Sequence, residues 1–207
     1  MSIMTRRQAL ALTAAALTVP ATGASAQDRS VLVEVSKYLN QLTAIQGQFT
    51  QVNADGSRIG GQYYMLRPGR IRFEYDGNQS MVMADGSSVG VFDAKSTNIV
   101  QRYPLSQTPL RLLLRRDIDL AAQGVAVSTG SQDGFTSVVL RDPRRPRDGY
   151  MTLVLRNSPP SLNQWTVTDR SGRNTTVVLN TIERAPNMSR RLFNIAAEVN
   201  NWQLGRR

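Results

Sequence analysis

The sequence predicts a mainly β protein with helices, built as a strongly curved antiparallel sheet or half-open β-barrel of about eleven strands. Turn signals recur roughly every 8–12 residues through two long stretches, and apolar and polar residues alternate between them. An amphipathic segment precedes the first stretch, and a leucine-rich segment separates the two. We expect these helices to lid a hydrophobic cavity, since a barrel of this size has room for one small ligand or acyl chain.

Residues 1–26 are predicted to be a cleaved export signal. Arg6 and Arg7 form a basic region, residues 9–19 form a short apolar segment, and small residues ending at Ala26 form a signal-peptidase site. The apolar segment is too short to span a bilayer. The arginine pair suits both the general secretory route and the twin-arginine route, and the sequence leaves the two open.

The remaining residues, 27–207, are predicted to fold as a single domain, because they contain no linker and no internal repeat. No cysteine follows the cleavage site, so we expect no lipid anchor. We expect a periplasmic protein without a stable membrane anchor.

The amino-terminal part should be a helix over residues 28–45, with Asp28 as its N-cap and Gly47 ending it. An apolar stripe runs along this helix, made by Val31, Val35, Leu39 and Leu42. Short strands of an antiparallel meander should follow as far as residue 103. Their turns are marked by Asp55-Gly56, Pro68-Gly69, Asp76-Gly77, Asp85-Gly86 and Asp93-Ala94.

The most regular hairpin spans residues 66–86. After the Pro68-Gly69 turn, Ile71, Phe73 and Tyr75 alternate with charged residues and should point to one face. Arg67 stands just before the turn, at the edge of that apolar face. This arrangement favours a binder of apolar ligands over a catalyst.

The middle of the chain changes pattern at residues 108–114. Thr108 is a candidate N-cap followed by Pro109, which predicts a short helix that either ends there or continues, kinked, to residue 122. A polar loop is expected over residues 142–148, within a second meander. The predicted strands of this meander are residues 125–129, 135–141, 150–156, 162–168 and 175–182.

Composition argues against catalysis, metal binding and cofactors. The chain has neither histidine nor cysteine, which removes the common nucleophilic systems and nearly every zinc site. We therefore expect a protein that is not an enzyme and has no catalytic, metal or cofactor site.

The net charge of +10 comes mostly from arginines that alternate along strands or lie in turns. This placement indicates a solvated face, and we expect no nucleic-acid partner. Five arginines could meet an acidic partner or anionic lipid head groups, or could simply face water: Arg115, Arg116, Arg144, Arg145 and Arg147.

Two sets of residues are candidates for the ligand site. The expected lining of the acyl cavity is Phe49, Tyr63, Met65, Ile71, Phe73, Met81, Met83, Met151 and Trp165. Flexible methionines suit variable acyl chains, although ordinary core packing would explain the same residues. The expected apolar side of the lid is Leu110, Leu112, Leu113 and Leu114, for which a plain helix-on-sheet contact is the alternative.

The motifs, taken in order, resemble those of the periplasmic outer-membrane lipoprotein carrier proteins, the LolA-like family. The resemblance rests on Gly47-x-Phe49-x-Gln51, the run from Arg67 to Tyr75, Asp85-Gly86, Pro109-Leu110 with the leucines after it, Trp165-x-x-x-Asp169-x-x-Gly172-x-x-Thr175-x-Val177, and Phe193 as part of a closing strand. Several family members carry an aromatic residue where this chain has Ile71.

The resemblance implies a half-open barrel with a helical lid over a hydrophobic cavity. It implies a monomeric chaperone that takes acylated lipoproteins from an inner-membrane ABC exporter to an outer-membrane acceptor. Arg67 matches the family arginine that holds the lid shut by hydrogen bonds, a role that suits its planar fork of donors. The alternative is a periplasmic lipid-binding or envelope-stress sensor module of the same fold.

Overall fold

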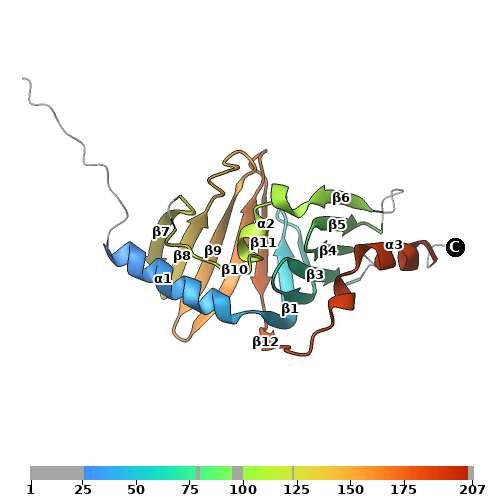
Figure 1. Ribbon diagram of the computed structural model, residues 1–207, viewed down its shortest axis with the longest axis horizontal. Helices are drawn as coiled ribbons and strands as arrows, with labels where there is room; N and C mark the ends of the chain where they lie inside the picture. The colour runs from blue at the N-terminus through green and yellow to red at the C-terminus, as the bar shows by residue number, and fades with distance from the viewer. Residues whose placement is uncertain (1–25, 78–79, 95–99, 123, 205–207) are drawn as a thin grey trace, which may run out of the picture.

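The protein is built on one curved, twelve-stranded antiparallel sheet (Figure 1). The computed structural model describes residues 26–77, 80–94, 100–122 and 124–204. The first six strands are β1 (Ala44–Val52), β2 (Arg58–Leu66), β3 (Arg70–Tyr75), β4 (Met81–Asp85), β5 (Ser88–Phe92) and β6 (Gln101–Pro104). The others are β7 (Ala126–Gln132), β8 (Phe135–Leu140), β9 (Tyr150–Asn157), β10 (Pro160–Thr168), β11 (Asn174–Leu179) and β12 (Glu183–Arg184).

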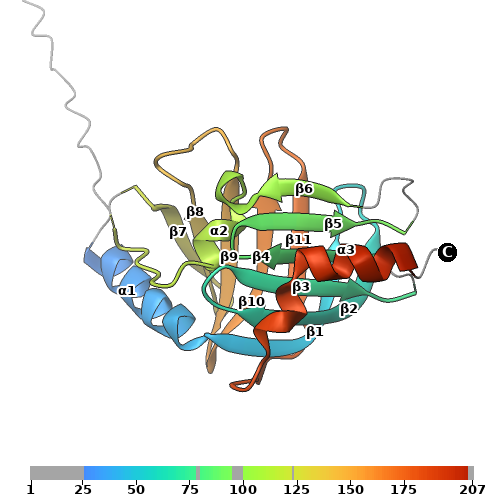
Figure 2. The ribbon, with the colours of Figure 1, turned by 45° about the vertical axis from the view of Figure 1, so that its right-hand side comes forward.

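The strand order shows two halves that meet at β1. The order is β6-β5-β4-β3-β2-β1-β11-β10-β9-β8-β7, with β12 pairing β1 beside this path. The amino-terminal strands therefore form one side of the arch and β7–β11 form the other (Figure 2). The halves join where Phe49 pairs with Leu179 and Val52 with Thr176. The predicted fold class is confirmed, and the strand beyond the expected eleven is the two-residue β12.

The predicted turns at Asp55-Gly56, Pro68-Gly69 and Asp85-Gly86 join β1 to β2, β2 to β3 and β4 to β5. At the β2–β3 turn, Gly69 has φ +80°, and a Cβ on it would come within 2.7 Å of the Gly86 Cα, so this position needs glycine. The β2–β3 turn at Gly69 and the β4–β5 turn at Gly86 are therefore packed against each other at the same end of their strands.

The helix α1 (Ala26–Gln41) is shorter at its carboxyl end than predicted. Ile45 was expected to be the last residue of the helix but belongs to β1, because its spacing fits a strand equally well. Gly47 does not end a helix: it lies inside β1, where a Cβ would come within 2.2 Å of the Thr181 carbonyl oxygen. Asp28 lies inside the first turn rather than at the N-cap, and its carboxylate accepts a hydrogen bond from the Thr129 hydroxyl (2.6 Å).

The leucine-rich segment forms two short turns of helix, the 3₁₀ turn η1 (Leu105–Gln107) and α2 (Leu110–Leu113). The alternative of a kinked helix to residue 122 is wrong, because residues 114–122 run without helix as far as they are assigned. We call residues 114–120 the strap. It lies against α1, on the concave side of the sheet (Figure 1).

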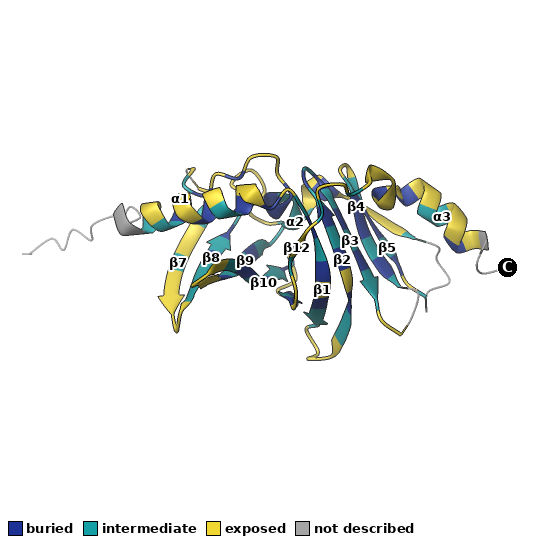
Figure 3. Ribbon diagram, turned by 90° about the horizontal axis from the view of Figure 1, so that it is seen from below, coloured by how far each residue is buried: buried dark blue, intermediate teal, exposed yellow. Residues whose placement is uncertain are grey.

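The carboxyl-terminal residues contain a helix that the sequence reading missed, α3 (Ile195–Leu204). It follows the 3₁₀ turn η2 (Arg190–Phe193), so Phe193 does not lie in a closing strand. Its beginning carries a sequence signal: the Asn194 side chain accepts a hydrogen bond from the Ala197 amide (3.0 Å), as an N-cap does. Figure 3 shows α3 beside β3–β5, far from α1, which lies along β7–β10.

A second apolar cluster lies between α3 and the convex face of the sheet. It contains Met81, Met83, Phe92, Phe193, Ile195 and Trp202. Met81 and Met83 pair with Glu74 and Arg72 across β3–β4, so they share the face opposite Phe73. The prediction that these two methionines line the concave cavity is therefore wrong.

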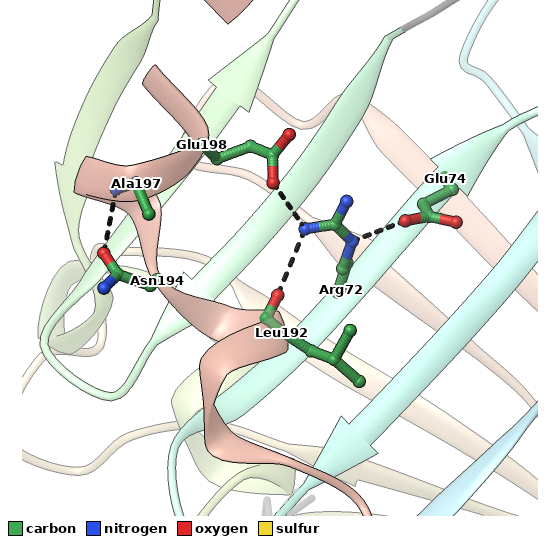
Figure 4. Close-up of polar contacts among 6 residues, drawn as sticks. All are labelled: Arg72, Glu74, Leu192, Asn194, Ala197 and Glu198. Carbon is green, nitrogen blue, oxygen red and sulfur yellow. Dashed lines mark hydrogen bonds and ion pairs between the residues drawn. The ribbon is translucent and has the colours of Figure 1, made fainter. Parts of the chain in front are cut away.

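Arg72 fastens α3 to the convex face (Figure 4). Its guanidinium contacts Glu74 (2.6 Å), Glu198 (3.0 Å) and the Leu192 carbonyl (3.1 Å). Burial alone would lower the pKa of Arg72, but the hydrogen bonds to Glu198 and Glu74 outweigh it and raise the pKa. The side chain therefore stays charged where it is largely shielded from water.

We expect Glu198→Gln to loosen α3 without disturbing the sheet. The amide keeps an acceptor for Arg72 but loses the charge, which should weaken the docking of α3 by about 1 kcal/mol. Hydrogen exchange of the α3 amides should then be several-fold faster. Glu183→Gln, on exposed β12, is the control, and equal exchange rates in both variants would contradict this role of Arg72.

The predicted export signal falls almost wholly on residues 1–25, which lie outside the described ranges. None of the helices within those ranges is long and apolar enough to cross a bilayer.

Candidate functional site

The candidate site is the apolar core between the concave face of the sheet and its covering helices. Seven of the nine predicted lining residues belong to this one cluster: Phe49, Tyr63, Met65, Ile71, Phe73, Met151 and Trp165. The predicted lid residues Leu112, Leu113 and Leu114 are buried in the same cluster, and Leu110 packs against it. From α1 the cluster includes Leu32, Val35 and Leu39. The structure thus brings the sheet and lid residues together, except for Met81 and Met83.

Aromatic rings join the two halves of the sheet at the bottom of this core. The Phe49 ring meets Phe73 edge-to-face, with centroids 5.0 Å apart, and meets Tyr75 in the same way at 5.5 Å. Phe73 also lies 6.2 Å from Trp165 on β10. These contacts fill the interior between the two halves with side chains.

Tyr63 is buried in the concave core and Tyr75 is partly buried there, and neither phenol adds a charge. The Tyr63 hydroxyl donates to the Thr181 carbonyl (3.0 Å), and burial, with the charges of Tyr38 and Glu183, raises its pKa. Burial also raises the pKa of Tyr75 to about 12, although its hydroxyl donates to Gln51 (2.7 Å). Both phenols are neutral at physiological pH, which suits a site for apolar ligands.

Two polar residues of α1 hold the strap. The Asn40 side chain donates to the Ile118 carbonyl (2.9 Å) and accepts from the Ile118 amide (3.0 Å). The Ser36 hydroxyl accepts from the Leu120 amide (2.9 Å) and donates to Leu32 (2.6 Å). Neither residue was among the site residues predicted from the sequence. Their signal was polarity at positions beside the apolar stripe of the helix.

Arg67, at the end of β2, holds α1 and the strap to the sheet. Its guanidinium donates to the carbonyls of Arg115 (2.8 Å) and Arg116 (3.0 Å) in the strap. It also donates to the Leu39 carbonyl and to the Asn40 side chain (3.0 Å) in α1. Its own backbone amide donates to Thr43 (2.7 Å), which fixes the base of the side chain. One side chain thus joins α1 and the strap to the end of β2.

Arg67 is only 8% exposed, and its fixed partners are neutral oxygens. Among the ion pairs of the described residues, none involves Arg67. Burial lowers the pKa of its guanidinium, and the charge of Asp117 opposes that effect. An arginine remains protonated under such conditions, so the fork keeps its donors. Its partners lie on α1 and the strap, so all four bonds depend on these two segments staying against the end of β2.

A groove of about 760 Å³ opens beside the core, between α1 and the ends of β8–β10. Its apolar part is formed by Val31, Val35, Tyr38 and Leu155. Charged side chains at its margin are Glu34, Lys37, Arg156 and Arg184. This groove connects solvent with the buried stripe of α1, and it was not predicted from the sequence.

The described part of the chain holds no group of three or more acidic residues that could bind a metal ion. The geometry offers a buried apolar core that is covered by hydrogen-bonded segments.

Comparisons with known proteins agree with this geometry. The sequence model of one protein family, described as outer membrane lipoprotein carrier protein LolA, matches residues 40–196. An outer-membrane lipoprotein carrier protein of Pseudomonas aeruginosa is 27% identical over 173 residues, which cover 79% of this chain and 82% of that protein. The protein of the same name from Neisseria meningitidis is 24% identical over 166 residues, covering 77% and 79%.

Among solved structures, a domain from Vibrio parahaemolyticus bears the name of an outer membrane lipoprotein-sorting protein. It superposes with a TM-score of 0.51 at 7% identity and covers 82% of this chain and 97% of that chain. At such low identity the likeness shows the fold alone.

Proposed function

Since the chain belongs to the family of outer membrane lipoprotein carrier proteins, LolA, we propose that it is a periplasmic chaperone for the acyl chains of lipoproteins. It receives lipoproteins released by an inner-membrane ABC exporter and carries them, as a monomer, to an outer-membrane acceptor. It performs no chemical reaction on them. The observation that carries this proposal is an apolar core closed by a lid that one buried arginine holds.

Binding requires the lid to move, because side chains fill the concave core. With Arg67 released, α1 and the strap move outward, and the acyl chains replace the leucines of the lid against the sheet. Burying one methylene is worth about 0.8 kcal/mol, so ten methylenes contribute roughly 8 kcal/mol. Such affinity alone would make release slow.

The latch solves the problem of release. Closing the lid restores the hydrogen bonds of Arg67 and the apolar contacts of Leu112, Leu113 and Leu114. This gain is available only when the core is empty, so closure competes with the acyl chains and lowers their net affinity. The carrier can then pass its cargo to an acceptor that has no such competing state.

The two tryptophans of the chain allow a direct test. Trp165 lies in the concave core, whereas Trp202 belongs to α3 and packs against the other face of the sheet. We expect palmitate to change the fluorescence of a Trp202→Phe variant, which reports on Trp165, and to leave that of Trp165→Phe unchanged. A response only from Trp202 would place the ligand on the convex face and contradict the proposed site.

The cellular role needs a second measurement. Depleting the protein should leave lipoproteins stranded in the inner membrane, which fractionation of the envelope detects. Correct sorting after depletion would reject the carrier role and favour a sensor role for a protein that still binds palmitate.

A further inference from the structure

Six arginines surround the edge of the lid, beside the latch. A groove of about 650 Å³ there is lined by Arg70 of β3, Arg111 of α2, and Arg115 and Arg116 of the strap. On the other side of Arg111, the loop after β8 adds two more cations, whose charges act on it. We call this set the lid-edge patch: Arg70, Arg111, Arg115, Arg116, Arg144 and Arg145.

The cations of the patch are only partly compensated. Asp142 pairs with Arg111, and Asp148 lies 3.5 Å from Arg145. Asp85 lines the groove, but its carboxylate accepts bonds from Ser87 and Ser88 within its own turn. Burial lowers the pKa of Arg111, and repulsion by Arg115, Arg145 and Arg144 lowers it further. Oxygen anions that fit between these side chains would relieve the repulsion.

The patch is joined to the latch through the backbone. Arg115 and Arg116 have exposed side chains in the patch, whereas their carbonyls accept hydrogen bonds from Arg67. The preceding residue, Leu114, accepts a bond from the Gly69 amide (2.8 Å) at the same turn. Any force that draws the two arginine side chains outward therefore pulls on two of the bonds that close the lid.

We propose that the lid-edge patch is the docking surface for an acidic protein partner, and that docking there releases Arg67 and opens the lid. The inference rests on the proposed carrier function. A protein fits better than a membrane, because the patch is partly a groove between three segments, which protruding carboxylates can enter and a flat bilayer cannot. The bidentate fork of arginine also matches a carboxylate.

Three of the adjacent arginine pairs in the sequence allow a matched experiment. Arg115→Glu/Arg116→Glu and Arg144→Glu/Arg145→Glu reverse charge inside the patch, and the second variant leaves the strap unchanged. Arg190→Glu/Arg191→Glu makes the same change at the exposed η2, beside the convex face. Poly-L-glutamate serves as the acidic probe, and vesicles of phosphatidylglycerol serve as the membrane probe.

Poly-L-glutamate should bind the parent protein and the Arg190/Arg191 variant in a salt-dependent manner, and each patch variant about tenfold more weakly. Binding should speed hydrogen exchange at the amides of Ile118 and Leu120, which α1 holds in the closed lid. It should also speed release of preloaded palmitate. Hydrogen exchange at the strap amides can be measured without cargo. Failure to bind palmitate would therefore count against the carrier function and not against docking at the lid-edge patch.

Three results would overturn the inference. The first is equal binding of poly-L-glutamate by the parent and both patch variants. The second is binding without faster exchange at the strap amides. The third is that phosphatidylglycerol vesicles, and not poly-L-glutamate, bind through the patch, which would make it a membrane surface.

Discussion

Replacing Arg67 by leucine is expected to leave the sheet folded and to trap bound acyl cargo. The substitution removes all four side-chain hydrogen bonds that join β2 to α1 and the strap. Their loss should weaken the closed state by at least about 2 kcal/mol, roughly a thirtyfold change in the closing equilibrium. Because closure competes with cargo, palmitate should dissociate more slowly by a similar factor.

The measurement is stopped-flow release of labelled palmitate into an excess of phosphatidylcholine vesicles. Arg58→Leu is the control, since it makes the same change at an exposed position of the same strand. Arg67→Lys should resemble Arg67→Leu more than the parent, because one ammonium cannot reach carbonyls on both α1 and the strap. Release from Arg67→Leu at the parent rate would show that the arginine is structural only.

Phe49→Ala is expected to destabilise the empty protein by about 3–5 kcal/mol and to be partly rescued by palmitate. Phe49 is fully buried where β1 meets β11, and its ring contacts Phe73 and Tyr75. Truncation leaves a cavity in the core and removes these ring contacts. An acyl chain that enters the concave core can fill that cavity, so added palmitate should restore part of the loss.

Urea unfolding with and without palmitate measures both effects. The chain offers a matched control in Phe92→Ala, because Phe92 is equally buried and packs on Trp202 in the convex cluster, with ring centroids 5.5 Å apart. We expect a similar loss of stability there but no rescue beyond that seen in the parent. Equal rescue of both variants would argue against a concave site.

The sequence predicted the sheet well because its signals are local. Ile71 and Phe73 alternate with charged residues, so their face of β3 was the one expected to lie in the core. Arg67 stands beside a turn that fixes its place relative to this face. For such residues, neighbours in the chain are enough to define the environment.

The errors come from residues whose environment depends on distant segments. In β4, Met81 and Met83 alternate with the apolar residues Val82 and Ala84, so no polar side chain marks the outer face. Only the position of α3, which covers Met81 and Met83, shows that these two side chains lie on the convex face. Likewise, Ile45 fits both the stripe of a helix and the alternation of a strand.

The contacts between α1 and the strap could not be predicted from the sequence for the same reason. Asn40 meets Ile118, and Ser36 meets Leu120, across more than seventy intervening residues. Polar residues on a helix are usually solvated, and only the folded strap shows that these two have fixed partners. The latch was predicted from a resemblance, whereas its partners on α1 and the strap came from the structure.

The meeting of the two halves at β1 and β11 has a consequence for how the chain folds. Phe49 can pair with Leu179 only after almost the whole chain has been made. Until then, each half of the sheet exposes the apolar side chains that the other half will cover. Pairing across so long a loop is slow, and the unfinished halves are prone to aggregate. A protein proposed to keep acyl chains away from water must therefore first keep its own apolar core from aggregating. That core stays exposed until β11, one of the last strands, pairs with β1.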